Sequence, residues 1–337
     1  MGRFLARRLA WFGVVAFAII TLTFVISRLI PADPARLAAG LNAEPEQVEE
    51  VRRLMGLDQP LVGQYLTYLR GLLRGDLGRS VQSRQPVVDD LRMFLPATVE
   101  LVGTAFVVYV ALGVSLGILW TVRPDSWIAR VIHLLTVGGV AVPVFWVGLV
   151  LQLILGTRLG WLPVAGRLSP DLVPPPTITG LYTVDAALAG RWDVWLDAVR
   201  HLVLPVAAAV FGVLSVATRL TRDSVTAELQ REYVRTARSK GVPEGRALLR
   251  HVLPNALNPV LTMLGLQFGW LLANSILVEV VFSWPGIGLY AFTAFQTFDY
   301  NPIMAVTLVG TVTFFLVNTA VDLLYPLLDP RITASRL

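Results

Sequence analysis

Few residues of this 337-residue chain are of the types that carry covalent or metal chemistry. The three histidines, His133, His201 and His251, are far apart in sequence, and cysteine is absent. A zinc protease would need a His-Glu-x-x-His motif, and a disulfide or thiolate metal site would need cysteines. The Gly-x-x-x-x-Gly-Lys-Ser/Thr phosphate loop of nucleotide-binding proteins is also missing. We therefore expect no catalytic centre and no metal or cofactor site in this chain.

A polar, basic run from Arg219 to Asn258 separates two apolar stretches and holds eight of the cationic side chains. Such charge is typical of the cytoplasmic loops of membrane proteins. The formal net charge of +5 comes almost entirely from arginine, with Lys240 as the only lysine. Because a positive inner surface also suits anionic lipid headgroups, the charge requires no nucleic-acid partner.

The composition is that of an integral membrane protein, with 55% hydrophobic residues, 15% charged residues and a mean hydropathy of +0.65. A helix needs about 20 apolar residues to cross a hydrocarbon core of roughly 30 Å. Six windows meet this need: 9–27, 101–122, 131–157, 202–218, 259–278 and 303–321. The first is longer than the apolar part of a signal peptide and lacks a small-x-small cleavage site, so we expect it to be retained. The sequence thus predicts an all-α, polytopic membrane protein with six transmembrane helices.

The distribution of positive charge predicts the orientation of the chain. Segments 1–8, 122–130, 219–258 and 322–337 hold 15 Lys and Arg in about 70 residues, whereas the alternate segments hold 12 in about 140. We therefore expect both termini and the basic run to lie in the cytoplasm. The domain plan has four parts: a tip with the first span (1–30), a helical extracytoplasmic insertion (31–95), a core of five spans (96–325) and a cytoplasmic tail (326–337).

The segments outside the spans differ in their patterning. Residues 31–95 contain amphipathic stretches, which predict two or three short helices. Residues 158–200 are rich in Pro, Gly and Trp, and within them we expect little regular structure in the turn-prone stretch 169–177. The segment from 283 to 302 is apolar but interrupted by Pro285, Gly286 and Gly288, which predicts a loop with one short helix.

Part of the basic run matches a known signature in spacing. Arg235-Thr236-Ala237, three residues, Gly241, nine residues and His251-x-Leu253-Pro254 follow the pattern Glu-Ala-Ala-x3-Gly-x9-Ile-x-Leu-Pro. That pattern marks the permease subunits of ABC importers, which this chain resembles. Its departures at Arg235, Thr236 and His251 have the form typical of the dipeptide, oligopeptide and nickel branch.

The resemblance to this branch extends along nearly the whole chain. The similar segments are GDLGRS (75–80), LPATVELV (95–102), PVFWVGLVL (143–151), LGWLPVAG (159–166), FSWPGIGLY (282–290) and LLDPRI (327–332). The long first outer segment is similar to that of the first permease subunit in peptide importers. The resemblance implies a type I ABC importer permease fold in a bacterial or archaeal cytoplasmic membrane, and import of peptides, with nickel or a metal chelate as the alternative substrate.

The resemblance also implies partners and a role for the basic run. The expected partners are a second, related permease, two ATPase subunits that bind ATP and magnesium, and an extracytoplasmic substrate-binding protein. In the family a coupling helix in this loop sits in a groove of the ATPase. The residues assigned to this contact are Arg235, Thr236, Ala237, Lys240, Gly241, Pro243, Leu253 and Pro254.

Local signals predict how this loop folds. Ser224 or Thr226 could cap a helix that runs to Ser239, and Gly241 would end it. Pro243 could start a second short helix, and Pro254 would end that one. A helix-turn-helix of this kind would form a rigid knob on the cytoplasmic face.

A translocation path is harder to recognise. Polar residues in or beside the spans are Gln152, Ser215, Gln267, Asn274, Glu279, Asn318 and Asp322. Gln267 and Asn274 are seven positions apart, hence on one helix face, and could line a cavity together with Glu279; hydrogen bonding between helices is the alternative role. Two Gly-x-x-x-Gly pairs, at 113 and 117 and at 265 and 269, predict close helix contacts, and Pro143 and Pro205 are expected to bend their spans. An ion-driven secondary transporter and an intramembrane enzyme are the alternatives from other classes; the first should show inverted repeats and charges at mid-membrane, which we do not find.

Overall fold

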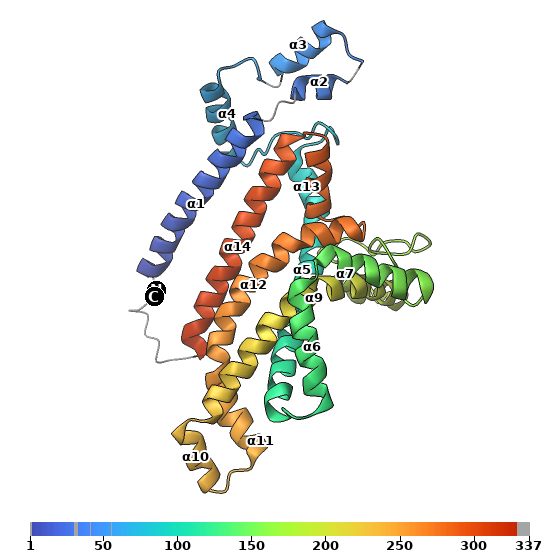
Figure 1. Ribbon diagram of the computed structural model, residues 1–337. Helices are drawn as coiled ribbons and strands as arrows, with labels where there is room; N and C mark the ends of the chain where they lie inside the picture. Colours follow the sequence, from blue (N-terminus) through green and yellow to red (C-terminus); the bar gives the residue numbers. More distant parts are fainter. Residues whose placement is uncertain (1, 30–32, 41, 55, 329–337) are drawn as a thin grey trace. The chain divides into compact units, whose positions relative to one another are not determined.

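A computed structural model of the chain describes residues 2–29, 33–40, 42–54 and 56–328, and all named elements within them are helices (Figure 1). The prediction of an all-α membrane protein is confirmed. Five helices are long and apolar enough to cross a membrane, or six if one bent pair counts as a single span. Helices are expected here because hydrocarbon offers no partner for backbone N–H and C=O groups, so each segment must pair them internally. Residues 329–337 of the predicted tail lie outside the described residues.

The chain divides into two compact units, of which the first comprises Met1–Thr98 and Pro285–Thr313. Its helices are α1 (Gly2–Leu29), α2 (Pro34–Ala39), α3 (Pro45–Leu54), α4 (Leu61–Leu73), the first turns of α5 (Val87–Val122), α13 (Ile287–Gln296) and the first turns of α14 (Tyr300–Leu328). The predicted short helices of the outer insertion are thus α2, α3 and α4, and the short helix before the last span is α13. One buried cluster joins Val87 and Leu91 to Ile287 and Ala305.

A tight loop follows α4 in the first unit. Residues Arg79 and Pro86 form an isolated β-bridge at its base. The buried carboxylate of Asp299 accepts hydrogen bonds from the Ser80 hydroxyl at 2.7 Å and from the backbone N–H of Val81 at 2.6 Å. These bonds fix the base of the loop next to the start of α14.

The second unit comprises Val99–Trp284 and Phe314–Leu337. Besides parts of α5 and α14 it contains α6 (Trp127–Ala141), α7 (Val144–Leu151), η1 (Gln152–Arg158), α8 (Tyr182–Leu188), α9 (Trp192–Leu229), α10 (Glu232–Ser239), α11 (Glu244–Ala247), η2 (Leu248–Val252) and α12 (Leu253–Val281). The long helix α9 contacts α6, α7, α8 and α12. It therefore forms the centre of this unit.

The window 131–157, predicted as the third span, is a pair of helices at a sharp angle and not one continuous helix. Helices α6 and α7 meet at 119° around Val142 and Pro143 (Figure 1). Proline has no N–H to bond the preceding turn and its ring disfavours helical geometry in the residue before it. The predicted bend at Pro143 is confirmed in a stronger form, whereas α9 continues through the buried Pro205.

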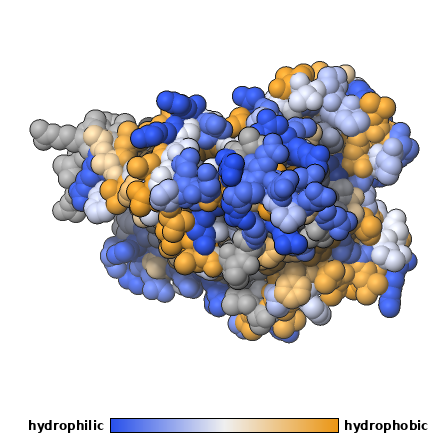
Figure 2. Space-filling model, turned by 90° about the horizontal axis from the view of Figure 1, so that it is seen from above, coloured by the Kyte–Doolittle hydropathy of each residue, from blue (hydrophilic) through white to orange (hydrophobic). Residues whose placement is uncertain are grey.

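The other spanning helices are longer than the apolar windows that predicted them. Helix α5 begins at Val87, well before position 101, and α9 extends beyond 202–218 at both ends. The length of an apolar window reflects the thickness of the hydrocarbon core, whereas a helix, once nucleated, extends into neighbouring polar residues at little cost. The helices are therefore longer than the windows. Large apolar side chains such as Leu134 (72% exposed) and Trp270 (64%) remain at the surface of these helices. The space-filling view shows hydrophobic residues lying among hydrophilic ones on the face that it draws (Figure 2).

The predicted glycine contacts are present in the second unit. A Cβ atom at Gly113 would lie 2.5 Å from the Cβ of Ala217, and one at Gly117 would lie 2.7 Å from the carbonyl oxygen of Thr218. Helices α5 and α9 can therefore approach only because these two residues lack side chains. Gly265 and Gly269 face Val321 and Phe314 of α14 in the same way.

Candidate functional site

The basic run folds into a compact elbow, residues 230–252, which joins α9 to α12. It contains α10, α11 and the π-helical turn η2. Figure 1 shows α10 and α11 beyond the adjoining ends of α9 and α12. A predicted helix-turn-helix is thus confirmed, although its boundaries differ from the prediction.

Helix α10 ends in the manner that its sequence predicts. Gly241 has a φ of +78°, a left-handed conformation that residues with a Cβ rarely adopt. The N–H of Gly241 donates to the carbonyl of Arg238 at 2.9 Å, and the N–H of Val242 donates to that of Ala237 at 3.2 Å. This pair of bonds is a Schellman motif, which satisfies the last carbonyls of the helix. The helix-ending role of Gly241 is confirmed.

An ion pair closes the elbow across this turn. Both Nε and Nη2 of Arg238 lie 2.9 Å from the carboxylate of Glu244, one oxygen each. Because Arg238 is in the last turn of α10 and Glu244 in the first turn of α11, each charge also complements its helix dipole. The two-point contact fixes the angle between the short helices.

The elbow is anchored to the unit by a small apolar core. Val234 of α10 is fully buried against Val225 of α9, Val252 at the end of η2 and Ala256 in α12. Beside it, the hydroxyl of Tyr233 hydrogen-bonds to Glu228 and lies 3.2 Å from the carbonyl oxygen of His251. Side chains from four elements therefore hold the elbow as one body with α9 and α12.

Two local predictions about this loop are wrong. Ser224 and Thr226 lie inside α9, which continues to Leu229, so neither caps a helix. Pro254 does not end a helix but occupies the first turn of α12. The first N–H groups of a helix have no partner within it, so a residue without an N–H is well tolerated there.

The eight residues that the sequence singled out for a partner contact all lie in or beside the elbow. Exposed are Arg235, Thr236, Lys240, Gly241, Pro243 and Pro254, whereas Ala237 and Leu253 are half-buried. Leu253 packs on the Val234 core and does not face outward. A Cβ placed on Gly241 would meet no atom of the chain within 4 Å, so this surface is open. The apolar side chain of Leu249 is 68% exposed on the same elbow.

The three residues suggested for a pathway are all on α12 but differ in environment. Gln267 is 8% exposed, and Glu279 is fully buried. The side-chain amide of Asn274 donates to the carbonyl of Trp270 at 2.9 Å, within its own helix. The side chain of Asp322 lies outside those described.

A buried charge network in the second unit was missed by the sequence analysis. Glu100 of α5 and Arg167 of the loop before α8 are 4% and 7% exposed, with Oε2 and Nη2 2.6 Å apart. The other oxygen of Glu100 accepts the N–H and the hydroxyl of Thr183, each at 2.7 Å. The guanidinium of Arg167 also lies 3.8 Å from the ring centre of Tyr182. A charged residue inside LPATVELV was a signal for such a site, but its partner is 67 positions away.

Another buried carboxylate, Asp185, orders the loop before α8. Its oxygens accept the backbone N–H groups of Ile178, Thr179 and Gly180 and the Thr179 hydroxyl, at 2.7 to 3.2 Å. Burial alone would raise the pKa of Asp185, but these hydrogen bonds together hold it below the ordinary value of 3.8. The loop before α8 is therefore ordered by polar side chains, and the predicted lack of regular structure at 169–177 is confirmed, whereas α8 and the start of α9 follow it.

Neither a metal cluster nor a nucleophile elbow emerges in the part of the chain that the structure describes. No group of three or more His, Cys, Asp or Glu is placed there to hold a metal ion. The residues Gly113-Val-Ser115-Leu-Gly117 do fit the Gly-x-Ser-x-Gly pattern of hydrolases, but they lie inside α5. That pattern is functional on a strand-to-helix turn.

Comparisons with known proteins give a consistent result along the chain. The family model described as "Binding-protein-dependent transport system inner membrane component" matches residues 113–334, and a model of the N-terminal part of such components matches residues 1–102. The chain is 41% identical to a probable D,D-dipeptide transport system permease protein of Escherichia coli K12, covering 97% of this chain and 96% of that protein. It is 39% identical to a di/tripeptide transport system permease protein of Pseudomonas aeruginosa, covering 99% of both. A dipeptide transport system permease protein of Alkalihalophilus pseudofirmus is 38% identical, with coverage of 97% and 98%.

Proposed function

The chain belongs to the family of binding-protein-dependent transport system inner membrane components, and we propose that it is a permease subunit of an ATP-driven peptide importer. The observation that carries the proposal is the similarity over nearly the whole chain to three permeases whose names specify dipeptides or tripeptides. For this reason we favour peptides over nickel or a metal chelate. The subunit forms half of the pathway, and ATP hydrolysis with magnesium takes place in partner subunits.

Uptake of a labelled dipeptide tests this function. The chain would be produced with its neighbouring transport subunits in a host that lacks peptide importers, and uptake would be compared with and without this subunit. We expect dipeptide uptake that requires this chain and ATP. Uptake of nickel but not of dipeptides under the same conditions would overturn the peptide assignment. Identification of the proteins that co-purify tests the expected second permease, two ATPases and binding protein.

We propose that the elbow is the surface through which ATPase motion reaches the spans. It is rigid, because the Arg238–Glu244 pair and the Val234 core hold it to α9 and α12. It is also open, with Arg235, Thr236 and Lys240 exposed around the Gly241 turn. A rigid body that exposes its tip while being fixed to two long helices can transmit a displacement to them.

Two glycine variants test the elbow. In Gly241→Val the new side chain strains a left-handed backbone and enlarges the proposed docking surface, so uptake should be lost and ATPase subunits should dissociate or hydrolyse ATP without transport. Gly190→Val is the matched control, because Gly190 has a φ of +67° and open space around it but lies between α8 and α9. Ala237→Asp should resemble Gly241→Val. Normal uptake in both elbow variants at wild-type expression would exclude the docking role.

We also propose that both termini and the elbow face the cytoplasm and that residues 31–95 face outward. The support is the charge distribution, with 15 cations in the four segments assigned inside. A reporter fused next to Lys240 should therefore be active in the cytoplasm, and one next to Arg84 outside. The opposite result at either site would refute this orientation.

For the pathway we propose that Gln267, Asn274 and Glu279 of α12 contribute polar groups in at least one state of the transport cycle. Because the chain has no cysteine, Gln267→Cys and Asn274→Cys can be probed with a water-soluble maleimide in each nucleotide state. At least one should react. Ala217→Cys, buried against Gly113, is the control that should stay protected. Protection of both test positions in every state would favour a packing role instead.

A further inference from the structure

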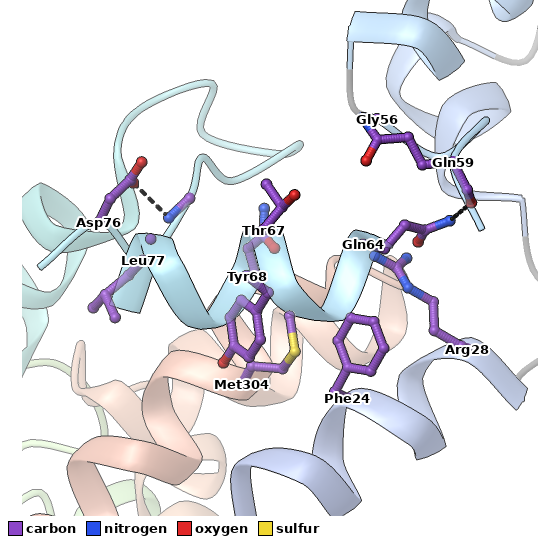
Figure 3. Close-up of a pocket in the computed structure, with 13 residues that line it drawn as sticks. Phe24, Arg28, Gly56, Gln59, Gln64, Thr67, Tyr68, Asp76, Leu77 and Met304 are labelled. Carbon is purple, nitrogen blue, oxygen red and sulfur yellow. Dashed lines mark hydrogen bonds between the residues drawn. The ribbon is translucent and has the colours of Figure 1, made fainter. Parts of the chain in front are cut away.

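A pocket in the first unit carries charged groups that have no role in the features described above. It has a volume of about 220 Å³ and lies between α1, α4, the turn that follows α4 and the start of α14 (Figure 3). A second pocket of about 760 Å³ shares four of its lining residues, Arg28, Asp76, Gly78 and Asn301. The two pockets therefore adjoin, and the larger one is within the size range of small-molecule sites.

Arg28, near the end of α1, is half-buried and lines both pockets. Among the described residues it has no ion-pair partner; its guanidinium carbon lies 5.2 Å from the ring centre of Phe24, one turn earlier. Its Nε is buried and has no hydrogen-bond partner within the described part of the chain. A guanidinium held beside an aromatic ring without a carboxylate is a strong site for an anionic oxygen.

Asp76 supplies the opposite charge at the other end of the smaller pocket. Its N–H donates to the carbonyl of Gly71 at 2.9 Å, which places it beside the C-terminal end of α4. One carboxylate oxygen accepts the N–H of Gly78 at 2.9 Å, and the described residues offer this carboxylate no cation. Figure 3 shows Asp76 and Arg28 at opposite ends of the pocket, with Arg28 beside Gln64 in the first turns of α4.

The separation of these two ends follows from helix geometry. Gln64 and Gly71 are seven residues apart on α4, which corresponds to about 10 Å at a rise of about 1.5 Å per residue. An extended dipeptide or tripeptide spans roughly 7 to 10 Å between its terminal charges, at about 3.3 to 3.6 Å per residue. The ammonium and carboxylate groups of a free amino acid are attached to the same carbon atom, so they could not reach both ends.

The wall between the charged ends is suited to an uncharged middle. Phe24 and Met304 are 5% and 4% exposed and pack with Tyr68. The side-chain oxygen of Gln64 is buried without a hydrogen-bond partner in the described residues, while its amide nitrogen donates to the carbonyls of Leu57 and Gln59. The apolar wall therefore suits the side chain of a peptide.

We propose that the smaller pocket binds a short zwitterionic peptide, with the peptide carboxylate on Arg28 and the peptide ammonium group on Asp76. The proposal rests on the peptide-importer function and adds a second place, on the permease itself, where substrate is held. The phosphate of a phospholipid headgroup is the other source of an anionic oxygen for Arg28. Asp76 favours the peptide, because it would repel the anion of a lipid that lacks an ammonium group.

The test uses the complete importer in nanodiscs, without its binding protein, and radiolabelled L-alanyl-L-phenylalanine as the probe. The wild-type complex should bind the dipeptide and should bind its C-terminal amide and its N-acetyl form at least tenfold more weakly. Arg28→Met should weaken binding of the free dipeptide at least tenfold but leave binding of the amide unchanged. Asp76→Asn should also weaken binding of the free dipeptide at least tenfold, but it should leave binding of the N-acetyl form unchanged. Arg70→Met, an exposed arginine of α4 outside the pocket, is the matched control.

Each outcome separates the explanations. Equal binding of the free and blocked peptides by the wild-type complex, or no loss in Arg28→Met, would overturn the proposal without depending on any variant's folding. Retention of a phospholipid that is lost in Arg28→Met but not in Arg70→Met, with no peptide bound, would assign the pocket to lipid. If the complete system with its binding protein imports the dipeptide while this pocket binds none, the importer function stands and only the pocket proposal fails.

Discussion

The buried pair of Glu100 and Arg167 allows a sharp test of how the second unit is held together. Glu100→Gln keeps the shape of the side chain but removes the charge that faces Arg167, whose Nη2 lies 2.6 Å away at 7% exposure. Removing one partner of a buried ion pair costs about 3–5 kcal/mol, because the other charge stays buried without compensation. At about 2–4 °C per kcal/mol, the melting temperature should fall by roughly 6–20 °C.

An exposed ion pair at the start of the same helix provides the control. Asp89 and Arg92 are 3.2 Å apart, and their side chains are 50% and 78% exposed. Such pairs contribute about 0–1 kcal/mol, so Asp89→Asn should shift the melting temperature by less than about 4 °C.

The assay is the loss of native tryptophan fluorescence of the purified protein in one detergent, heated at one rate. Adding Arg167→Met to Glu100→Gln should recover part of the loss, because the unpaired charge is then gone. A melting temperature for Glu100→Gln no lower than that of Asp89→Asn would refute the view that this pair holds the loop before α8 to α5.

Three further predictions follow from single contacts. Gly117→Leu should abolish folded expression, because its Cβ would lie 2.7 Å from the Thr218 carbonyl oxygen. Gly103→Leu should be tolerated, because a Cβ there would meet no atom within 4 Å. Equal yields of the two folded variants by size-exclusion chromatography would refute this. Hydrogen bonds hold the pKa of Asp185 below 3.8, so its ionised form stabilises the fold above that pH. The melting temperature of wild type should therefore exceed that of Asp185→Asn by an amount that shrinks as the pH falls below 3.8. A difference that stays constant over this pH range would contradict the prediction. Tyr233→Phe removes the hydroxyl that is bonded to Glu228 and, because this side chain is exposed, should cost about 0.5–1.5 kcal/mol in the same melting assay. Thr236→Val is the control, because its hydroxyl bonds only its own helix, and a loss for Tyr233→Phe no larger than that for Thr236→Val would contradict the prediction.

The sequence by itself determined the features that depend on neighbouring residues. Long apolar windows predicted the spanning helices, because hydrophobic length and internal backbone pairing are properties of one segment. The turn at Gly241 was predicted correctly, since a left-handed residue after a helix is a local requirement of the backbone. The glycine pairs of α5 and α12 likewise predicted close contacts, although the sequence did not name the facing helices.

Only the tertiary structure decided which distant groups meet. Pro143 predicted a bend, but neither the 119° angle between α6 and α7 nor their shared contact with α9 could be read from it. Glu100 meets Arg167 across 67 positions, and Arg28 forms no ion pair with a carboxylate in the described part of the chain, although two aspartates line the same pockets. The energy of a charge depends on its burial and on the partners brought to it from other elements, and neither quantity is encoded in the residues next to it in sequence.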